Sequence, residues 1–368
     1  MKNVEVSMDG LSLTLSGDKK NERLNVAGEY PGRAYASFLF SQLGLMHLVA
    51  HDLPSAVATN FWVAPQIQNL IKAMYAWEGG KTPAIHAPKK PFALPRLKTS
   101  PGKVAISYSG GKDSVWNLWR AIEKYGKENV LVVHIHGLNK ANSKDEFEYT
   151  LRQQKKYGFP NLQIIDLKNS AGVGGHEVMR SRDMFMVGLV APLAIEFGAS
   201  KVLIEGFSET SKIEPFSGQE KWMEYFNRVL RSLNVPIQVD WKNRGEMDVV
   251  KDLLINRPSW LSHVCNCFSA PCYRIPIRES WERNAPTFPL YDSQCGSCVK
   301  CRITNLGRLL HDPAMKRVQP EDISYFLKTT AKWIPDKWET HKDMLEGSFM
   351  REYVKALKKY HHEYLSAK

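Results

Sequence analysis

The 368-residue sequence has no long uninterrupted hydrophobic run. Its longest nearly apolar stretch, Met184 to Ile195, contains Gly188 and Pro192 and is shorter than the roughly 18 residues that a membrane span needs. The N-terminal residues do not combine a basic region with a long apolar core, so no secretory signal is visible. We therefore expect no transmembrane helix, no membrane partner, and a cytoplasmic location.

Cysteine is scarce and confined to one region. All six cysteines lie within the 37 residues from Cys265 to Cys301. In a large protein from a reducing compartment, such clustering favours a metal site over disulfide bonds. The cysteines are therefore expected to act as thiolate ligands.

Acidic residues are absent between Lys81 and Lys103, a segment that contains six basic residues and five prolines. This composition predicts an extended, basic, Pro-rich interdomain linker over residues 81–102. The linker carries about half of the net charge of +12, which results from 50 Lys and Arg against 38 Asp and Glu. Clustered positive charge can attract nucleic acid or another acidic partner, whereas a solvated connector is the simpler interpretation.

The predicted linker separates two parts of the chain. Residues 1–80 begin with alternating stretches typical of short strands and continue with helical apolar patterns, so they predict an α+β accessory domain. Residues 103–260 alternate short hydrophobic runs with helical patterns, which predicts an α/β domain with a parallel sheet covered on both faces. Strands are expected at Val104–Tyr108, Val130–Ile135, Leu162–Leu167 and Val202–Glu205. Ligands of such sheets bind beyond the carboxyl ends of the strands.

The first of these strands leads into a short glycine-containing loop, followed by a helix expected from about Val115. The loop residues are Ser109, Gly110, Gly111, Lys112, Asp113 and Ser114. Its two glycines let the backbone turn tightly and bring amide N–H groups to an anion, and the positive end of the helix dipole adds to the attraction. The loop is neither a Walker A nor a GxGxxG loop. It predicts a phosphate-binding site; an Asp-capped helix is the alternative.

Three cysteines near the end of the cluster are spaced as CxxCxxC: Cys295, Cys298 and Cys301. This spacing lets one loop wrap a single metal ion, and a fourth ligand would complete a tetrahedral zinc site. Cys265, Cys267 and Cys272 lie upstream and are candidates for that ligand. Zinc is the expected metal, and an iron–sulfur cluster is the alternative.

The loop resembles the SGGxDS loop of the PP-loop, or N-type ATP pyrophosphatase, superfamily. Together with the cysteines, residues 103–310 resemble the 7-cyano-7-deazaguanine synthase (QueC-like) branch of that superfamily. The further matches are the turn Gly206–Glu209, the helix Met247–Lys251, Asn266–Phe268 and Cys295–Arg302. The resemblance implies an adenine nucleotide alpha hydrolase-like PP-loop domain, with a four-cysteine zinc lobe over residues 261–310. On that alignment Cys267 is the best fourth zinc ligand and Cys272 its main rival. Residues 311–368 predict a helical tail.

The resemblance also implies an activity, that of an ATP-dependent carbon–nitrogen ligase using ATP and Mg²⁺. Such an enzyme adenylates the carboxylate of a 7-deazaguanine and releases pyrophosphate, and an amine then displaces AMP. Lys112, Asp113 and Ser114 are the expected catalytic residues, and the whole loop, Arg182 and Gly206 are expected to bind the nucleotide. The product would be the free nitrile or an amide conjugate on a partner protein, as suits QueC-like proteins with added segments in antiphage defence operons.

The chain departs from this family at several positions. Lys112 stands where the family commonly has an apolar residue, and the 27 residues between Cys267 and Cys295 form a longer insert than usual. Alternative functions are a tRNA-thiolating PP-loop enzyme and a non-catalytic zinc-containing adaptor. For Arg182 the alternative role is a salt bridge with Asp183 or Glu177. His134 and His136 are expected to pack or form hydrogen bonds, and nucleic-acid contact by the tail is less favoured than packing.

Overall fold

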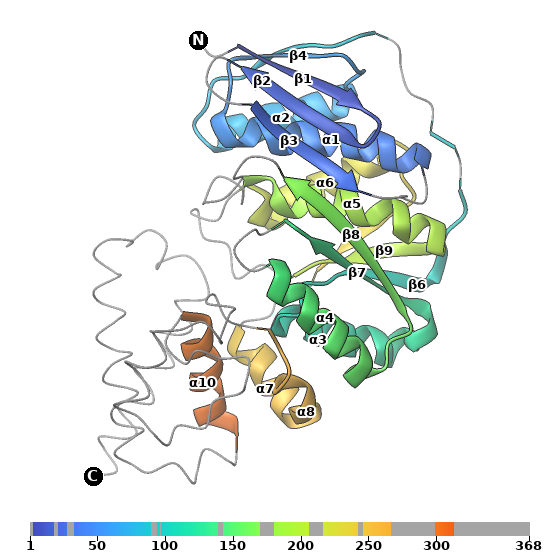
Figure 1. Cartoon of the computed structure of the whole chain (residues 1–368), viewed down its shortest axis with the longest axis vertical. Helices are drawn as coiled ribbons and strands as arrows, with labels where there is room; N and C mark the ends of the chain where they lie inside the picture. Colours follow the sequence, from blue (N-terminus) through green and yellow to red (C-terminus); the bar gives the residue numbers. More distant parts are fainter. Residues whose placement is uncertain are drawn as a thin grey trace, which may run out of the picture.

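A computed structural model describes residues 3–17, 21–27, 33–89, 94–95, 97–138, 143–169, 180–205, 216–241, 246–265 and 299–312. Its strands form one ten-stranded sheet in the order β10-β9-β6-β7-β8-β3-β2-β1-β4-β5 (Figure 1). The N-terminal strands are β1 (Asn3–Asp9), β2 (Ser12–Gly17), β3 (Asn21–Ala27), β4 (Ala56–Thr59) and β5 (Ala84–His86). The later strands are β6 (Ser100–Ser107), β7 (Val130–His136), β8 (Asn161–Asn169), β9 (Ala199–Leu203) and β10 (Gln238–Asp240).

Helices connect these strands and cover the sheet. The N-terminal part contains α1 (Arg33–Asp52) and α2 (Pro65–Trp77). The later part contains α3 (Lys112–Tyr125), α4 (Ser143–Tyr157), α5 (Arg182–Phe197), α6 (Glu220–Ser232), α7 (Glu246–Asn256), α8 (Pro258–Leu261) and α10 (Val299–His311), with the 3-10 turns η1 (Lys127–Asn129) and η3 (Phe216–Gly218). None of the described helices is both long enough and apolar enough to cross a membrane.

Strands β6 to β10 pair in parallel throughout, which confirms the predicted α/β class. Successive side chains of a strand point to opposite faces, and both faces are buried here. On β6 and β7, Val104, Ile106 and Val132 pack with residues of α3, α7 and α8. The alternate residues Leu131 and Val133 pack with α1, α5 and α6 on the other face. The near-continuous hydrophobic runs of these strands follow from that double burial.

The N-terminal part continues the same sheet. β3 pairs antiparallel with β8, with Val26 opposite Leu167, and β2, β1, β4 and β5 follow in turn. The predicted α+β character of this part is present, but its hydrophobic core is continuous with that of the parallel part. Pairing with β3 covers an edge of the parallel sheet that would otherwise expose unpaired backbone groups. The short β5 and the start of β6 fall inside the predicted linker of residues 81–102.

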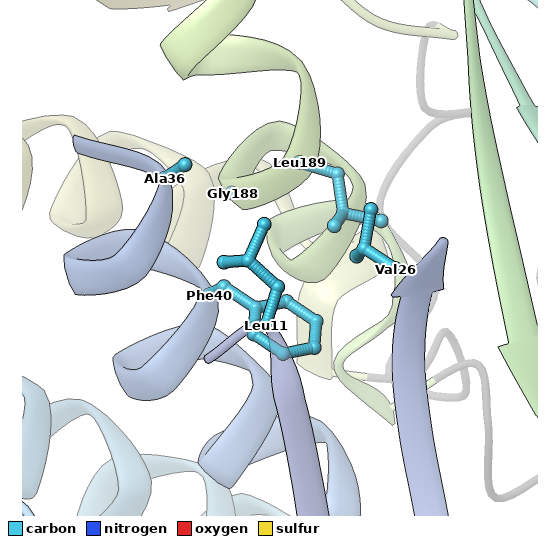
Figure 2. Close-up of a pocket in the computed structure, with 6 residues that line it drawn as sticks. All are labelled: Leu11, Val26, Ala36, Phe40, Gly188 and Leu189. Carbon is cyan, nitrogen blue, oxygen red and sulfur yellow. The ribbon is translucent and has the colours of Figure 1, made fainter. Parts of the chain in front are cut away.

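Helices α1 and α5 cross closely where both carry glycine. A Cβ atom on Gly188 would lie 2.7 Å from a side-chain carbon of Leu43, and one on Gly44 would lie 2.4 Å from Leu13. Figure 2 shows the gap beside this crossing, lined only by apolar residues: Leu11, Val26, Ala36, Phe40, Gly188 and Leu189. The gap is too narrow to admit water, so it is part of the packed core and carries no chemistry.

Candidate functional site

The predicted phosphate loop lies where the order of the parallel strands reverses. β6 pairs in parallel with β7 on one side and with β9 on the other. Helix α3, which follows β6, packs on one face of the sheet, and α5, which precedes β9, packs on the other. In open α/β sheets, ligands bind at such a reversal of strand order, beyond the carboxyl ends of the strands. Residues 109–114 follow β6 directly. The loop thus occupies the position at which open α/β sheets bind their ligands.

The two serines of the loop hold its shape. The hydroxyl oxygens of Ser109 and Ser114 lie 3.0 Å apart, and the Ser109 backbone N–H donates to the Ser114 hydroxyl at 3.3 Å. The Gly111 N–H donates to the Ser109 hydroxyl at 3.3 Å, and the Ser114 hydroxyl is 3.2 Å from the Gly111 carbonyl. Ser114 is fully buried. Its side chain therefore supports the loop from within.

The two glycines have different structural requirements. Gly110 has a φ of +79°, in the left-handed region that favours glycine. A Cβ atom at Gly110 would lie 3.0 Å from the side-chain oxygen of Gln153. Gly111 is the N-cap of α3, and no side chain caps this helix. Because α3 begins at Lys112 and not at Val115, the positive end of its dipole faces the loop, and the alternative of an Asp-capped helix is wrong.

Lys112 and Asp113 form an ion pair at the start of α3. The Lys112 amine lies 2.8 Å from the Asp113 carboxylate. The Lys112 side chain is 1% exposed, whereas that of Asp113 is 29% exposed. Burying an amine is costly unless it is paired, so Asp113 stabilises the position of Lys112. The structure thus brings two of the three expected catalytic residues into contact and leaves the Asp113 carboxylate accessible to solvent.

Gln153 of α4 anchors the loop and was not predicted. Its side-chain amide nitrogen donates to the Gly110 carbonyl at 2.9 Å and to the His263 carbonyl at 2.7 Å. Its amide oxygen accepts a 2.7 Å hydrogen bond from the buried Tyr108 hydroxyl, whose pKa is raised by burial so that it stays protonated. The Cys265 N–H also donates to the Gly110 carbonyl, at 2.8 Å. A glutamine within a polar helical pattern gives no sequence signal for this role.

The segment that leads into the cysteine region therefore lies against the loop. A Cβ atom on Gly110 would be 3.7 Å from the Cβ of Cys265, and the Cys265 side chain is partly exposed. Of the two cysteines that the structure describes, Cys265 is the one that lies at the candidate site. The sequence had placed it only among the alternatives for the fourth metal ligand.

Most of the predicted zinc lobe lies outside the described residues, including Cys267, Cys272, Cys295 and Cys298. Cys301 is described and fully buried in the first turn of α10. That helix packs tightly on α7, where a Cβ atom on Gly307 would meet Val250 at 2.7 Å. Within the ranges that the structure describes, no group of three or more His, Cys, Asp or Glu could hold a metal ion. The zinc site stays a prediction.

A charged group borders the loop on the β9 side. The Ser109 hydroxyl donates to the Glu205 carboxylate at 3.1 Å, and Glu205 follows the carboxyl end of β9. Arg182, the first residue of α5, forms a 3.0 Å ion pair with Asp183, which is the salt bridge given as its alternative role. Burial disfavours the charge of Arg182, but the carboxylates of Asp183, Glu205 and Glu146 raise its pKa overall. Gly206 and Glu177 lie outside the described residues.

His134 and His136 stand at the end of β7. The Nδ1 of His134 lies 3.0 Å from the Tyr108 carbonyl and 3.3 Å from the Thr150 hydroxyl. Burial lowers the pKa of His134 to about 4, and the neighbouring His136 contributes to that lowering. A neutral imidazole bonded in this way supports the strand end next to the loop. The structure therefore favours the packing and hydrogen-bonding role expected for His134.

Comparison with known protein families finds no family model that matches the chain, and a search of curated proteins finds no match. The fold and the geometry of the loop are therefore the grounds on which a function is proposed.

Proposed function

We propose that the chain is an ATP-dependent carbon–nitrogen ligase that activates the carboxylate of a 7-deazaguanine as an acyl-adenylate. The observation that carries the proposal is the position of the SGGKDS loop. It lies at the carboxyl end of β6, at the reversal of strand order, with the uncapped N-terminus of α3 directed at it. The positive end of a helix dipole at this position suits the phosphates of a nucleotide.

The proposed reaction has two bond exchanges. A carboxylate oxygen of the substrate attacks the α-phosphorus of ATP, and the bond to the bridging oxygen breaks to release pyrophosphate. An amine then attacks the acyl carbon, and AMP leaves. Positioning of the reactants and neutralisation of phosphate charge would supply most of the rate enhancement. Arg182 suits the phosphate role because its planar guanidinium can donate two parallel hydrogen bonds.

The residues at the loop also suit Mg²⁺. Asp113 in the loop and Glu205, which accepts a hydrogen bond from Ser109, offer partly exposed carboxylates, and Mg²⁺ prefers such oxygen ligands together with substrate phosphates. The ion would supply charge neutralisation for the phosphates when bound. If Asp113 bound the ion, its ion pair with Lys112 would weaken. The Lys112 amine would then bind a phosphate oxygen. Asp113 is preferred to Ser114 for this role because the Ser114 hydroxyl is buried within the loop.

The acceptor of the activated acid defines the product. Ammonia would give an amide and, after a second activation, a nitrile. An amine of a partner protein would give a covalent conjugate. The exposed basic residues Lys89 and Lys98 would attract an acidic, extended segment of such a partner. Nucleic acid as the acceptor is the less favoured variant of this proposal.

The test is product analysis with the full-length protein. Incubation with ATP, Mg²⁺ and 7-carboxy-7-deazaguanine should release pyrophosphate and AMP in a substrate-dependent manner. Asp113→Asn should abolish this release, whereas Asp240→Asn should not, because Asp240 lies on β10 and pairs with Lys201. Release of ADP and phosphate alone would overturn the proposal. ATP binding without any turnover would favour the non-catalytic adaptor.

Conjugation has its own readout, the intact mass of candidate partner proteins after the same incubation. A mass increase equal to the acid minus water would support attachment to the partner. Unmodified partners together with rapid formation of the nitrile would favour the free small-molecule product.

A second candidate function, tRNA thiolation, is favoured by Cys265 beside Gly110. In that reaction ATP would adenylate a base oxygen, and the outer sulfur of a persulfide carried by a cysteine would attack the activated carbon as AMP leaves with that oxygen. A second thiol would then attack the carrier sulfur, which breaks the S–S bond, forms a disulfide and leaves the sulfur on the base. Cys265→Ser should then abolish sulfur transfer and leave adenylation intact. Stoichiometric zinc in a colourless, anaerobically purified protein would count against an iron–sulfur version of this function.

A further inference from the structure

Three consecutive residues at the start of α5 connect the N-terminal part of the chain to the candidate site. The first, Arg180, reaches toward the C-terminal end of α1. Its guanidinium donates to the Ala50 carbonyl at 2.8 Å and to the His51 carbonyl at 3.3 Å, and it pairs with Glu78 at 3.1 Å. The last carbonyls of a helix lack partners within the helix, so a cation at this point stabilises it. Arg180 thus fastens the start of α5 to α1.

The second residue, Ser181, is the N-cap of α5 but does not act as a usual cap. A serine at this position ordinarily accepts a hydrogen bond from a backbone N–H of the first helical turn. No side-chain cap bond is present here, and the Ser181 oxygen lies 2.9 Å from Nδ1 of His47. The Asp183 N–H, which a capping serine would have bound, donates instead to the Ser217 hydroxyl at 3.4 Å. The Ser181 hydroxyl therefore bonds to His47 of the N-terminal helix α1 and does not cap α5.

His47 is held firmly in one position. It is 2% exposed, and its ring stacks on Phe185 with centroids 4.5 Å apart and planes 9° from parallel. Burial, followed by the charges of His51 and Arg182, lowers the pKa of His47 to about 3, so the ring is neutral. Its Nε2 is buried without a hydrogen-bond partner among the described residues. An unpartnered buried nitrogen is unfavourable, so a residue selected for packing alone would be better replaced by phenylalanine.

The third residue, Arg182, is the one proposed to bind phosphate. It directly follows Ser181 in the chain, so the hydrogen bond from His47 fixes the backbone from which the Arg182 side chain extends. On its other side Arg182 pairs with Asp183. Its environment also includes Glu205, which binds the loop hydroxyl of Ser109. The path from α1 to the loop therefore runs through His47, Ser181, Arg182 and Glu205.

We infer that His47 is a positioning residue which, through its hydrogen bond to Ser181, sets the direction of Arg182 toward the phosphates bound at the loop. The inference rests on the proposed function, because it takes Arg182 as a phosphate ligand. It gives the N-terminal part of the chain a role in the site itself, in addition to any role in binding a partner. The neutral imidazole suits this role because it can form a hydrogen bond with a hydroxyl group in an apolar environment.

Four variants of the full-length chain separate this role from packing. His47→Phe keeps an aromatic ring on Phe185 but removes the hydrogen bond, and Ser181→Ala removes the other partner. His47→Asn is the conservative variant, because an asparagine amide places a polar atom near the position of Nδ1. Ser41→Ala is the matched control: Ser41 is a buried hydroxyl on α1 that donates to the Phe38 carbonyl and accepts from the Gln42 side chain, both in the same helix.

The measurements are the dissociation constant of ATP with Mg²⁺, the KM and kcat of pyrophosphate release, and the thermal unfolding temperature. His47→Phe and Ser181→Ala should each weaken ATP binding and raise KM by about tenfold to a hundredfold, a range typical of a displaced binding group, while remaining folded. The double variant should be no weaker than either single variant, because both remove one interaction. His47→Asn should stay within about twofold of the parent, and Ser41→Ala should not change ATP binding.

The inference is overturned if folded His47→Phe binds ATP like the parent, or if the two single effects add in the double variant. Failure of the proposed function looks different, because the parent chain itself would then release no pyrophosphate and AMP from ATP in the presence of the acid. In that case the NMR signal of the Arg182 side-chain nitrogen still tests the positioning. The signal is assigned by its absence from the spectrum of Arg182→Lys. It should move in His47→Phe and Ser181→Ala and stay in place in Ser41→Ala; an unmoved signal in the first two variants would refute the inference.

Discussion

Replacing Gln153 with methionine is the sharpest test of how the loop is held. Methionine has a similar length and suits a buried position, but it removes both donors and the acceptor of the amide. The Tyr108 hydroxyl and the His263 carbonyl lose the hydrogen bonds that Gln153 provides, whereas the Gly110 carbonyl keeps its bond from Cys265. Each buried polar group left without a partner costs about 1–3 kcal/mol. The Tyr108 hydroxyl is buried, whereas His263 is exposed and its carbonyl can accept from water, so we expect the free energy of unfolding to fall by about 1–3 kcal/mol.

Urea unfolding of the full-length chain measures this cost, and ATP binding measures its local effect. Gln154→Met is the matched control, because Gln154 is the next residue on α4 and its side chain makes none of these bonds. Tyr108→Phe on the Gln153→Met background should recover part of the lost stability, since it removes the buried group left without a partner. Weaker ATP binding should accompany Gln153→Met at a temperature where the protein is folded. The reasoning is refuted if Gln153→Met unfolds within about 0.5 kcal/mol of the parent, the range of an ordinary surface substitution.

Three further predictions concern the loop, the buried histidines and the metal. Gly110→Ala should weaken ATP binding strongly, whereas Gly158→Ala, which has a similar φ of +70° but no neighbour within 4 Å, should cost only backbone strain; equal effects on ATP affinity would contradict this. His47 and His134 have pKa values lowered to about 3 and about 4, so below pH 6.5 they take up protons only on unfolding. The free energy of unfolding should fall by about 1.4 kcal/mol per pH unit for each histidine between pH 6.5 and pH 4, and His47→Phe should reduce that slope in urea titrations. Cys298→Ser or Cys301→Ser should release the predicted zinc and destabilise the region around α10, as measured by metal analysis and limited proteolysis, and full zinc retention by either variant would disprove its role as a ligand.

The parallel half of the fold could be predicted from the sequence because its signals are local. The runs from Val130 to Ile135 and from Leu162 to Leu167 match β7 and β8. The start of α3 was misjudged by three residues, because the helix begins directly after the glycines. Gly111 takes the N-cap position without a capping side chain, so the usual sequence marker of a helix start is missing.

The continuation of the sheet into the N-terminal part could not be predicted in the same way. β3 carries a strand pattern, but nothing in its sequence specifies β8 as its partner, since pairing of distant strands is decided by the tertiary fold. The same limit applies to the site. The loop residues were found from their own pattern, whereas Gln153, Glu205 and His47 act through contacts more than 40 residues away along the chain.

The bonds around Gly110 also connect the cysteine region to the proposed ATP site. The Gly110 carbonyl accepts from the Cys265 backbone and from Gln153, and Gln153 in turn binds the His263 carbonyl. A movement of residue 263 or 265 would therefore change the environment of the Gly110 carbonyl, which directly precedes Gly111 and the start of α3. A rearrangement of the cysteine region on metal loss would reach the loop through these bonds, because they are shared by both segments. Loss of zinc should for this reason lower the affinity for ATP as well as the stability, and an unchanged ATP affinity in zinc-free, folded protein would show that the two regions act independently.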